Sequence, residues 1–374
     1  MKFLGNRSPQ DFFSTFWEKE ILHIPSAVEI PTEPILESDL IEMAADEYFE
    51  ARLIQYNDKI KIQNSPLKIK NFKELTGKWT LMIHNLNLYN EFALSLEKTV
   101  EFIPKWLFDD VMCSVSSKDS IINAHIDNYN VFILQVKGSR KWLIEKNPDK
   151  KYQDDCDLKI LENFNPDSEF ILNPGDMIYI PPHVAHEGIS LEDSISVSIG
   201  FKSIEDKDLV ENYLVNLMEN INTDDFLKTE LKNASTDPFL IEQDIVNELY
   251  DRMNRLVSNK EEFSKWVNSY MATPKKKPEI TDDKLCFDTF KAELKDGVFC
   301  FDEFIRMSTM KQKDHFLVNL NEYAFNLDEK QYITLRELIA NKHLEMENQD
   351  VEGLENILFD LYKNNLLMLI DKED

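Results

Sequence analysis

The sequence contains little glycine, only 8 residues in a chain of 374. Loops that cradle phosphate groups need several glycines in close succession. Neither the dinucleotide-binding pattern Gly-x-Gly-x-x-Gly nor the phosphate-binding Gly-x-x-x-x-Gly-Lys-[Ser/Thr] occurs. The Gly-x-Ser-x-Gly pattern around the nucleophile of many hydrolases is missing as well. These absences exclude the commonest nucleotide-binding motifs and the serine hydrolases that depend on such a turn.

Cysteine and long hydrophobic runs are also scarce. The four cysteines are far apart and form no Cys-x-x-Cys, so we expect reduced thiols and no zinc cluster; they are Cys113, Cys156, Cys286 and Cys300. No run approaches the ~20 apolar residues of a membrane helix, and residues 1–7 turn polar too soon for a signal peptide. We therefore expect a cytoplasmic protein that does not contact a membrane.

Positive charge is in deficit, with 42 Lys and Arg against 69 Asp and Glu, a formal net charge of −27. Such a chain repels nucleic acid phosphates and attracts basic partners. The 43% hydrophobic and 11% aromatic content is that of a folded globular protein. A chain of this length can form two or three domains.

Residues 1–203 have the pattern of many short strands with a few helices. We expect helices at Phe12–Glu20 and Leu40–Ala51. Gly138 separates two of the predicted strands and indicates a hairpin between them. The predicted strands are Ile60–Ile62, Trp79–Ile83, Val131–Val136, Lys141–Ile144, Met177–Ile180 and Ser194–Phe201. The sequence thus predicts an α+β protein whose first domain is a double-stranded β-helix, or jelly roll.

Residues 204–272 change to helical periodicity, with three successive apolar faces. These faces either pack against one another or form a dimer interface, and the pattern alone does not decide between the two. Residues 272–278, with two prolines around three lysines, indicate a linker. We expect a small α+β domain in residues 279–374, compatible with a winged helix. Its candidate recognition segment, Gly353–Asp360, is acidic, so direct DNA binding is not expected.

The most informative motif is His125-Ile126-Asp127, followed far downstream by His186. Residues two apart on a strand point to the same face, so His125 and Asp127 can share one metal ion. His183 and His186 both follow a predicted strand and compete as the third ligand. We prefer His186, because it leads directly into the next strands whereas His183 lies within the turn. Two imidazoles and one carboxylate form the facial triad of non-haem Fe(II) oxygenases.

Each part of this motif also has an ordinary explanation, either a surface His-Asp pair or a buried histidine of the core. The conjunction favours the metal site. An apolar strand follows the His-x-Asp, Pro174-Gly175-Asp176 precedes a second strand, and Pro181-Pro182 ends that strand before the histidine.

An open Fe(II) site needs a co-substrate that helps to activate O₂, and 2-oxoglutarate requires a cation for its distal carboxylate. Arg140 follows the Gly138 turn and can clamp a carboxylate with two parallel hydrogen bonds. Lys141 points to the opposite face and is the weaker candidate. Ser114 and Ser116 share one face of a preceding strand, and either hydroxyl could add a hydrogen bond. An exposed turn arginine and solvent-facing serines are the alternatives.

Taken together, four segments resemble the JmjC-type ribosomal oxygenases of the cupin superfamily, in particular the bacterial branch that hydroxylates an arginine of a large-subunit ribosomal protein. The segments are His125–Ile133, Gly138–Trp142, Pro174–Pro182 and His186–Gly188. The resemblance implies Fe(II) ligands at His125, Asp127 and His186. It places the 2-oxoglutarate carboxylate at Arg140, with Ser116 beside it. It also implies a JmjC barrel, a helical dimerisation region and a winged-helix-like C-terminal domain.

One segment departs from the family pattern. Relatives often carry glycines just before the His-x-Asp, but residues 117–124 contain none. We therefore leave the path of this loop and the residue it recognises open. Asp119 could pair with a substrate guanidinium, although an exposed loop acid is the simpler reading.

We predict an Fe(II)- and 2-oxoglutarate-dependent protein hydroxylase that uses O₂ and acts on a basic protein, expected to be a ribosomal protein. We also expect a homodimer. Two alternatives remain. The first is another JmjC-type oxygenase, such as a histidyl hydroxylase or a demethylase. The second is a cupin interaction protein without catalytic activity.

Overall fold

The computed structural model describes residues 3–56, 60–153, 158–220, 239–278, 284–341 and 343–370. The predicted thiol Cys156 lies outside these ranges. The chain divides into two compact units, Met1–Ser203 and Ile204–Asp374.

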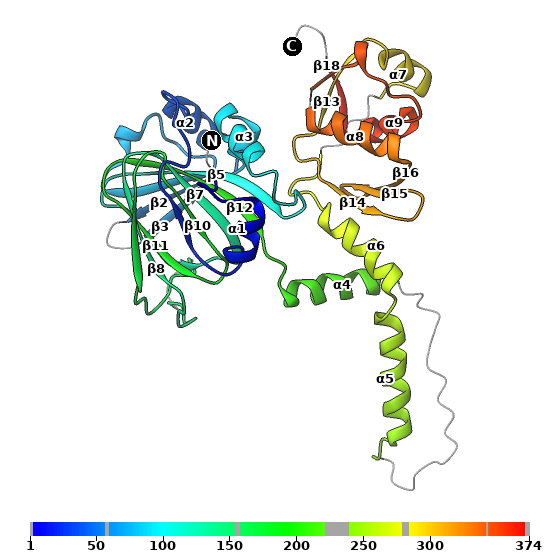
Figure 1. Ribbon diagram of the computed structural model, residues 1–374, viewed down its shortest axis with the longest axis horizontal. Coiled ribbons are helices and arrows are strands. Elements are labelled where there is room, and N and C mark those ends of the chain that lie inside the picture. Colours follow the sequence, from blue (N-terminus) through cyan, green and yellow to red (C-terminus); the bar gives the residue numbers. More distant parts are fainter. Residues whose placement is uncertain are drawn as a thin grey trace. The chain divides into compact units, whose positions relative to one another are not determined.

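The first unit consists of two antiparallel sheets that face each other (Figure 1). The larger sheet has the strand order β1-β10-β7-β12-β5-β4-β2-β3. Its strands are β1 (Leu22–Ile24), β2 (Ala51–Tyr56), β3 (Ile60–Asn64), β4 (Lys78–Ile83), β5 (Phe108–Ser116), β7 (Tyr129–Lys137), β10 (Met177–Ile180) and β12 (Ser194–Lys202). The smaller sheet has the order β6-β11-β8-β9, with β6 (Ile121–Ile126), β8 (Arg140–Glu145), β9 (Ser168–Leu172) and β11 (Ala185–Ser190). From β5 to β12 each strand lies in the sheet opposite the preceding one, except that β8 and β9 pair within the smaller sheet, and this is the predicted double-stranded β-helix.

Three helices cover the outer face of the larger sheet: α1 (Pro9–Thr15), α2 (Glu37–Ala45) and α3 (Glu91–Thr99). Their buried side chains Phe12, Leu40 and Leu96 belong to one apolar cluster with Val111 and Val197 of the sheet. Side chains alternate along a strand, so the other residues of β5 and β12 face the smaller sheet. This second face is the interior of the barrel.

The predicted hairpin across Gly138 is wrong. β7 lies in the larger sheet between β10 and β12, whereas β8 lies in the smaller sheet between β11 and β9. Gly138 has a φ of +62°, and a Cβ there would lie 2.4 Å from the backbone oxygen of Asp193. This tight, left-handed turn sends the chain from one sheet to the other and requires glycine.

Both predicted N-terminal helices end earlier than expected. Helix α1 ends at Thr15 and α2 at Ala45. The predicted second helix ran on to Ala51, but that residue starts β2, where it is paired with Ile83 of β4. Pairing within the sheet has overridden the local helical pattern.

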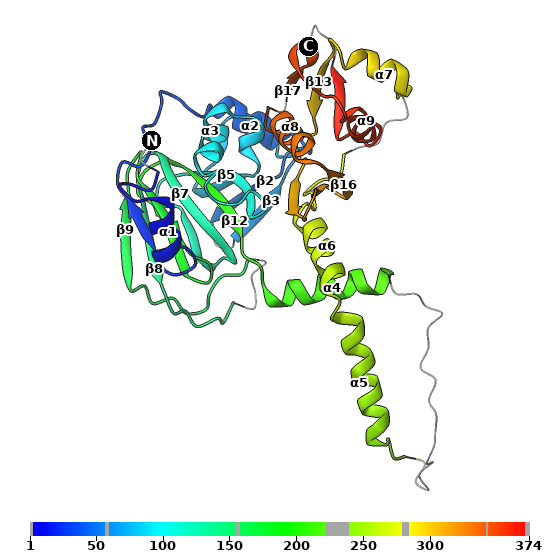
Figure 2. The same cartoon turned by 45° about the vertical axis from the view of Figure 1, so that its right-hand side comes forward.

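The second unit begins with three helices, as the periodicity predicted: α4 (Asp206–Asn220), α5 (Gln243–Val257) and α6 (Lys260–Met271). Helices α4 and α6 pack through Tyr213, Leu217 and Trp266. Helix α5 buries none of its residues and extends away from the rest of the unit in both views (Figures 1 and 2). The helical region therefore has one packed pair and one helix, α5, which contacts that pair through Val257 and leaves most of its other apolar residues exposed.

The rest of this unit contains two three-stranded sheets, β17-β13-β18 and β14-β15-β16, with three helices. The elements are α7 (Phe287–Glu293), β13 (Val298–Phe301), β14 (Met307–Lys311), β15 (Phe316–Leu320), β16 (Tyr323–Leu327), α8 (Glu329–Asn341), β17 (His343–Glu345), α9 (Glu355–Lys363) and β18 (Leu367–Ile370). The likeness to a winged helix stays a prediction.

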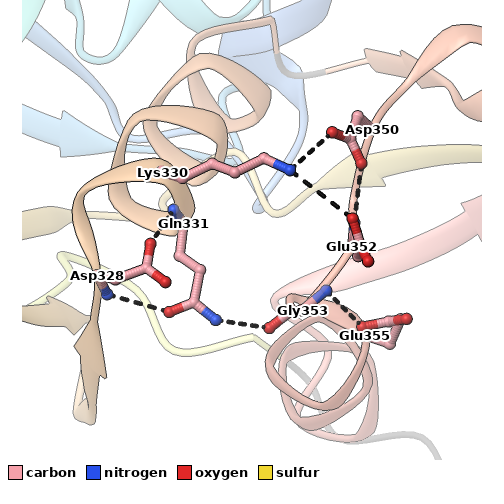
Figure 3. A network of polar contacts seen from close by, with 7 residues as sticks. All are labelled: Asp328, Lys330, Gln331, Asp350, Glu352, Gly353 and Glu355. Atoms are coloured by element: carbon pink, nitrogen blue, oxygen red, sulfur yellow. Dashed lines mark hydrogen bonds and ion pairs between the residues drawn. The ribbon is translucent and has the colours of Figure 1, made fainter.

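Polar contacts join the start of α8 to the segment before α9 (Figure 3). Asp328 and Gln331 cap the helix reciprocally, since each accepts a hydrogen bond from the backbone N–H of the other. The Gln331 amide also donates to the Gly353 carbonyl at 2.9 Å, and Lys330 lies 3.0 Å from the Asp350 carboxylate. These contacts fix the loop that connects the two helices.

Helix α6 is attached to the second of these sheets through Asn268, which is buried. Its side-chain amide donates to the Leu317 carbonyl at 2.9 Å and to Asn319 Oδ1 at 2.7 Å, and the Ser308 hydroxyl donates to the Asn268 carbonyl. The helical region and the C-terminal sheets thus share a polar core within one compact unit. Among the described residues, no helix has both the length and the apolar character needed to cross a membrane.

Candidate metal centre

The antiparallel pairing of β6 with β11 brings two histidines together. His125 and His186 are direct register partners, and their ring centroids lie 4.3 Å apart. Asp127 follows the end of β6 and joins them. One ligand atom from each of the three residues lies within 4.8 Å of the others. The structure therefore brings together the three residues that the sequence singled out.

Both imidazoles are oriented by backbone carbonyls. The Nδ1 of His125 lies 2.8 Å from the Asn123 carbonyl, and the Nδ1 of His186 lies 3.1 Å from the Val184 carbonyl. A carbonyl only accepts, so each Nδ1 carries the proton and each Nε2 keeps its lone pair for a metal. Both Nε2 atoms lie 3.6 Å from Oδ2 of Asp127.

The acid–base properties of the three groups follow from this packing. Burial opposes the charged form of His125, but the adjacent Asp127 carboxylate outweighs it and raises the pKa of His125. Burial and the neighbouring His125 lower the pKa of His186 to about 4. Burial acts to raise the pKa of Asp127, yet the two histidines hold it well below its usual range. His186 and Asp127 are thus in the forms that bind a metal at neutral pH.

His183, the competing candidate, lies in the turn after β10 with a φ of +67°. Its backbone N–H donates to the Asp127 carbonyl at 2.9 Å, and its ring is not part of the three-residue group. This turn therefore supports the ligand-bearing segment through its backbone.

Arg140 is fully buried inside the barrel. Its guanidinium donates to three hydroxyls: Ser114 at 2.8 Å, Ser116 at 2.8 Å and Ser194 at 3.1 Å. Burial lowers the pKa of Arg140 to about 10. The sequence analysis missed Ser194, because it lies at the start of a strand where nothing in the local pattern separates an inward from an outward serine.

The buried charge of Arg140 has no carboxylate partner within the described part of the chain, and its Nε has no hydrogen-bond partner. A buried cation that contacts only neutral hydroxyls is costly unless an anion joins it. These residues therefore fit a small ligand that ends in a carboxylate. The alternatives of an exposed turn arginine and solvent-facing serines are wrong, since all four side chains are buried.

Trp142 separates the two parts of the site. It lies between Arg140 and Ile144 on β8, and its ring centroid is 5.8 Å from that of His186. Gly188 is paired with Trp142, and a Cβ at Gly188 would approach the indole to 3.0 Å. A Cβ here would push the indole, which packs beside the metal ligand, by a few tenths of an ångström.

The carboxylate pocket, as we call the site formed by Arg140 with its three serine partners, and the metal triad lie at different depths of the barrel. On the smaller sheet Arg140 pairs with Ser190, and His186, four residues away, pairs with Ile144. At ~3.3 Å per residue, the two backbone positions are separated by about 13 Å. Arg140 is fully buried, whereas Asp127 keeps 41% of its side chain exposed. The triad therefore lies on the more exposed side of the site.

Across the barrel, two acidic residues lie at a bulge of β5. Phe201 pairs with Phe108 and Ile199 with Val111, so Asp109 and Asp110 together oppose Gly200. A Cβ on Gly200 would lie 3.6 Å from Oδ1 of Asp110 and 3.8 Å from Cβ of Asp109. Both acidic side chains thus lie on the inner face. The sequence analysis did not weigh them as site residues, because a local sequence does not reveal a bulge.

Asp110 lies at the same depth as the metal triad. On β5, Asp110 is four residues before Ser114, which contacts Arg140. On β11, His186 is four residues before Ser190, which is paired with Arg140. Its carboxylate is buried and accepts a 2.8 Å contact from the ring of His84, which follows β4. A side chain that enters the barrel and reaches the metal ligands therefore meets this carboxylate on the opposite wall.

The glycine-free segment 117–124 forms a tight, well-anchored turn. Asp119 adopts a φ of +61°, and its backbone N–H donates to the Ser190 carbonyl at 2.8 Å. The Ser120 hydroxyl donates to the Trp79 carbonyl at 2.9 Å, and the N–H of Lys118 donates to the Asp193 carboxylate at 2.8 Å. These side-chain contacts hold the turn in place without the glycines of the family pattern.

With this geometry established, comparisons with known proteins are informative. Residues 95–209 match the family model of the JmjC domain. This stretch of the chain is similar to JmjC domains. It is similar to a probable ribosomal oxygenase of Haemophilus influenzae, with 30% identity over 200 residues. That match covers 52% of this chain and 50% of the relative, so it spans about half the length of that protein.

Two further comparisons extend the likeness beyond the JmjC domain. The ribosomal protein uL16 3-hydroxylase of Escherichia coli is 25% identical over 272 residues, which cover 72% of this chain and 73% of that protein. The structure of YcfD, an Escherichia coli ribosomal oxygenase in complex with cobalt and 2-oxoglutarate, has a TM-score of 0.79 and 22% identity. It aligns with 98% of this chain and 99% of that one. The two structures share their fold over nearly the whole chain.

The segment that matches the JmjC model contains both the three grouped residues and the buried arginine. His125, Asp127 and His186 provide the His₂-carboxylate donor set that suits Fe(II) and leaves positions open for a co-substrate and O₂. Arg140 provides the buried cation that a keto diacid needs. The donor set and the orphaned guanidinium fit these groups independently of the resemblance.

Proposed function

We propose that this protein is an Fe(II)- and 2-oxoglutarate-dependent hydroxylase that acts on an arginine side chain of a large-subunit ribosomal protein. The observation that carries the proposal is the pairing of one triad with one buried guanidinium inside the same barrel. Neither part alone distinguishes an oxygenase from a structural metal site. Together they match a metal ligand set with a receptor for the far carboxylate of its co-substrate.

In this proposal His125, Asp127 and His186 hold the iron. Arg140, with Ser114, Ser116 and Ser194, binds the distal carboxylate of 2-oxoglutarate. When bound, the iron and 2-oxoglutarate supply the oxidation: O₂ is reduced, 2-oxoglutarate becomes succinate and CO₂, and one oxygen atom enters a substrate C–H bond. The protein fixes both imidazoles through Asn123 and Val184 and keeps the carboxylate pocket buried.

The acidic wall opposite the triad supports arginine as the hydroxylated residue. A substrate carbon held at the metal centre leaves the guanidinium of the same side chain several ångströms away from the metal ligands. Asp110 lies across the barrel at the depth of the triad, with Asp109 on the same inner face. A buried carboxylate binds a guanidinium through charge-assisted hydrogen bonds. A neutral histidine side chain would gain less from this wall.

The net charge supports a basic protein as the substrate. A chain that carries −27 attracts a cationic ribosomal protein and speeds its encounter at low ionic strength. The E. coli relative is named for the ribosomal protein uL16, which supports a large-subunit protein as the target. The acidic helix α9 gives no support to direct DNA binding.

The test is mass spectrometry of ribosomal proteins incubated with the enzyme, Fe(II), ascorbate and 2-oxoglutarate. We expect one added oxygen on an arginine of one large-subunit protein, with stoichiometric succinate. Arg140→Gln should lose both signals, because its neutral amide cannot replace the cation. Lys141→Gln, on the opposite face of the same strand, is the matched control and should keep them. Oxygen on a histidine or loss of methyl groups would favour the alternative JmjC activities, and no succinate release would favour a non-catalytic protein.

We also propose that the chain forms a homodimer through α4 and α5. These helices expose large apolar side chains, among them Val210, Met218, Leu249 and Met253. Apolar patches of this kind mark interaction surfaces. Sedimentation equilibrium should give twice the chain mass of 44.0 kDa. The double substitution M218E and M253E should give a monomer, and a wild-type monomer would contradict the proposal.

A further inference from the structure

One further histidine, His84, lies on the wall opposite the metal centre and belongs to neither the triad nor the carboxylate pocket. His84 follows β4 and contacts the Asp110 carboxylate through Nδ1 at 2.8 Å. Its side chain is 29% exposed, whereas that of Asp110 is 8% exposed. The ring thus lies between solvent and a buried acid on the inner wall of the barrel.

Two backbone features bring this pair together. Residues of β4 and β5 pair in register from Thr80↔Ser116 to Ile83↔Cys113, which carries His84 to the inner face. The backbone N–H of His84 donates to the Glu50 carbonyl at 3.0 Å, and this contact fixes the end of the strand. Alternation along β5 places Asp110 on the same face as Ser114. The ring and the carboxylate therefore meet because of sheet geometry and not by chance contact of two flexible surface groups.

We propose that His84 is a positioning residue for the substrate: it holds the Asp110 carboxylate in the orientation that accepts the cationic end of the substrate side chain. This inference rests on the proposed function. A carboxylate has two oxygens, and the contact of Oδ2 with His84 restricts rotation of the group. Oδ1 of the same carboxylate lies on the side of Gly200, where a Cβ would come within 3.6 Å of it.

The contact of His84 with Asp110 should increase the affinity for the substrate. A carboxylate that is already oriented loses less rotational freedom when it binds a guanidinium, so the substrate binds more tightly. The contact of His84 is with Asp110, on the wall opposite the metal ligands. Its loss should therefore weaken binding of the substrate protein while the iron and 2-oxoglutarate bind as before.

The experiment compares His84→Leu with His84→Gln in the full-length, iron-loaded protein. Loss of the ring contact in H84L should raise the KM for the basic substrate by about ten- to hundredfold, with kcat and the KM for 2-oxoglutarate within twofold of wild type. H84Q keeps an N–H donor near the carboxylate and should restore most of the affinity. H315L, which removes a histidine from the second unit, is the matched control and should behave as wild type.

Three outcomes would overturn the inference: an unchanged KM for the substrate in H84L, a parallel rise in the KM for 2-oxoglutarate, or no rescue by H84Q. Binding of a fluorescent arginine-containing ribosomal peptide to the metal-free protein gives a second readout that needs no turnover. Weaker peptide binding by H84L without turnover by the wild type would sink the proposed reaction but support the role of His84. A wild-type protein that binds no such peptide overturns the role of His84 as well.

Discussion

Replacement of Arg140 by methionine gives the sharpest test of the carboxylate pocket, because the structure predicts opposite effects on the free and the liganded protein. Arg140 is buried, and burial lowers its pKa to about 10. A base with a lowered pKa binds its proton less tightly in the folded state, so its charge destabilises the fold at every pH below about 10. A drop of this size corresponds to about 3 kcal/mol.

The loss of the guanidinium also has a cost. Ser116 keeps its contact with Thr80 at 2.9 Å, and Ser194 keeps its contact with Ser190 at 3.1 Å, but Ser114 loses a donor. One buried hydroxyl without a partner costs roughly 1–3 kcal/mol. The two effects nearly cancel. We therefore expect the free energy of unfolding of ligand-free R140M to equal that of the wild type or to exceed it by up to about 2 kcal/mol.

The stabilisation by 2-oxoglutarate should differ between the wild type and R140M. At a ligand concentration of 100 Kd, binding stabilises the wild type by about 2.7 kcal/mol, which raises the Tm of a unit of this size by about 5–10 °C. R140M should show no shift. Thermal unfolding with Mn(II) in place of Fe(II) measures this without turnover, and K141M is the matched control that keeps the wild-type shift.

Two results would refute the reasoning. A full 2-oxoglutarate shift in R140M would mean that the co-substrate does not use this guanidinium. A ligand-free R140M that unfolds far below the wild type would mean that the buried charge stabilises the barrel and is not held ready for an anion.

Three further predictions concern other parts of the molecule. His125→Ala should abolish succinate release and leave the far-ultraviolet circular dichroism unchanged, whereas His183→Ala should keep turnover; full activity of the first variant would contradict the ligand assignment. Gly188→Ala should lower metal affinity at least tenfold, measured by calorimetry, because its Cβ would approach the Trp142 indole to 3.0 Å. Asn268→Ala should destabilise the second unit by roughly 1–3 kcal/mol in urea unfolding, since it leaves buried acceptors unpaired, and an unchanged midpoint would show that this contact is dispensable.

Much of the fold was predictable from periodicity. The strand Met177–Ile180 and the helical faces of α4, α5 and α6 were predicted within a few residues, because apolar spacing is a local property. The sheet to which each strand belongs was not predictable. The chain on either side of Gly138 looks like a hairpin, and only the close approach to Asp193 shows that it crosses between sheets.

The residues of the candidate site also fall into a group that the local sequence predicts and a group that it does not. His125 and Asp127 were predicted because a recognisable apolar strand follows them, Arg140 because it follows a turn, and the resemblance supported the choice of His186. Ser194 was missed because its inward position depends on strand pairing, and the pair Asp109–Asp110 because only a bulge places both residues on one face. When the role of a residue depends on its partner on a neighbouring strand, the sequence around that residue does not reveal the role.

The attachment of α6 through Asn268 has a consequence for dissection of this protein. Residues 272–278 look like the natural place to cut between helices and C-terminal sheets. A chain that ended there would remove the Leu317 and Asn319 acceptors of Asn268. It would also expose to solvent the buried face of α6 that contacts the C-terminal sheet. The boundary that leaves both parts with their own contacts lies instead at Ser203, where the two compact units of the chain divide.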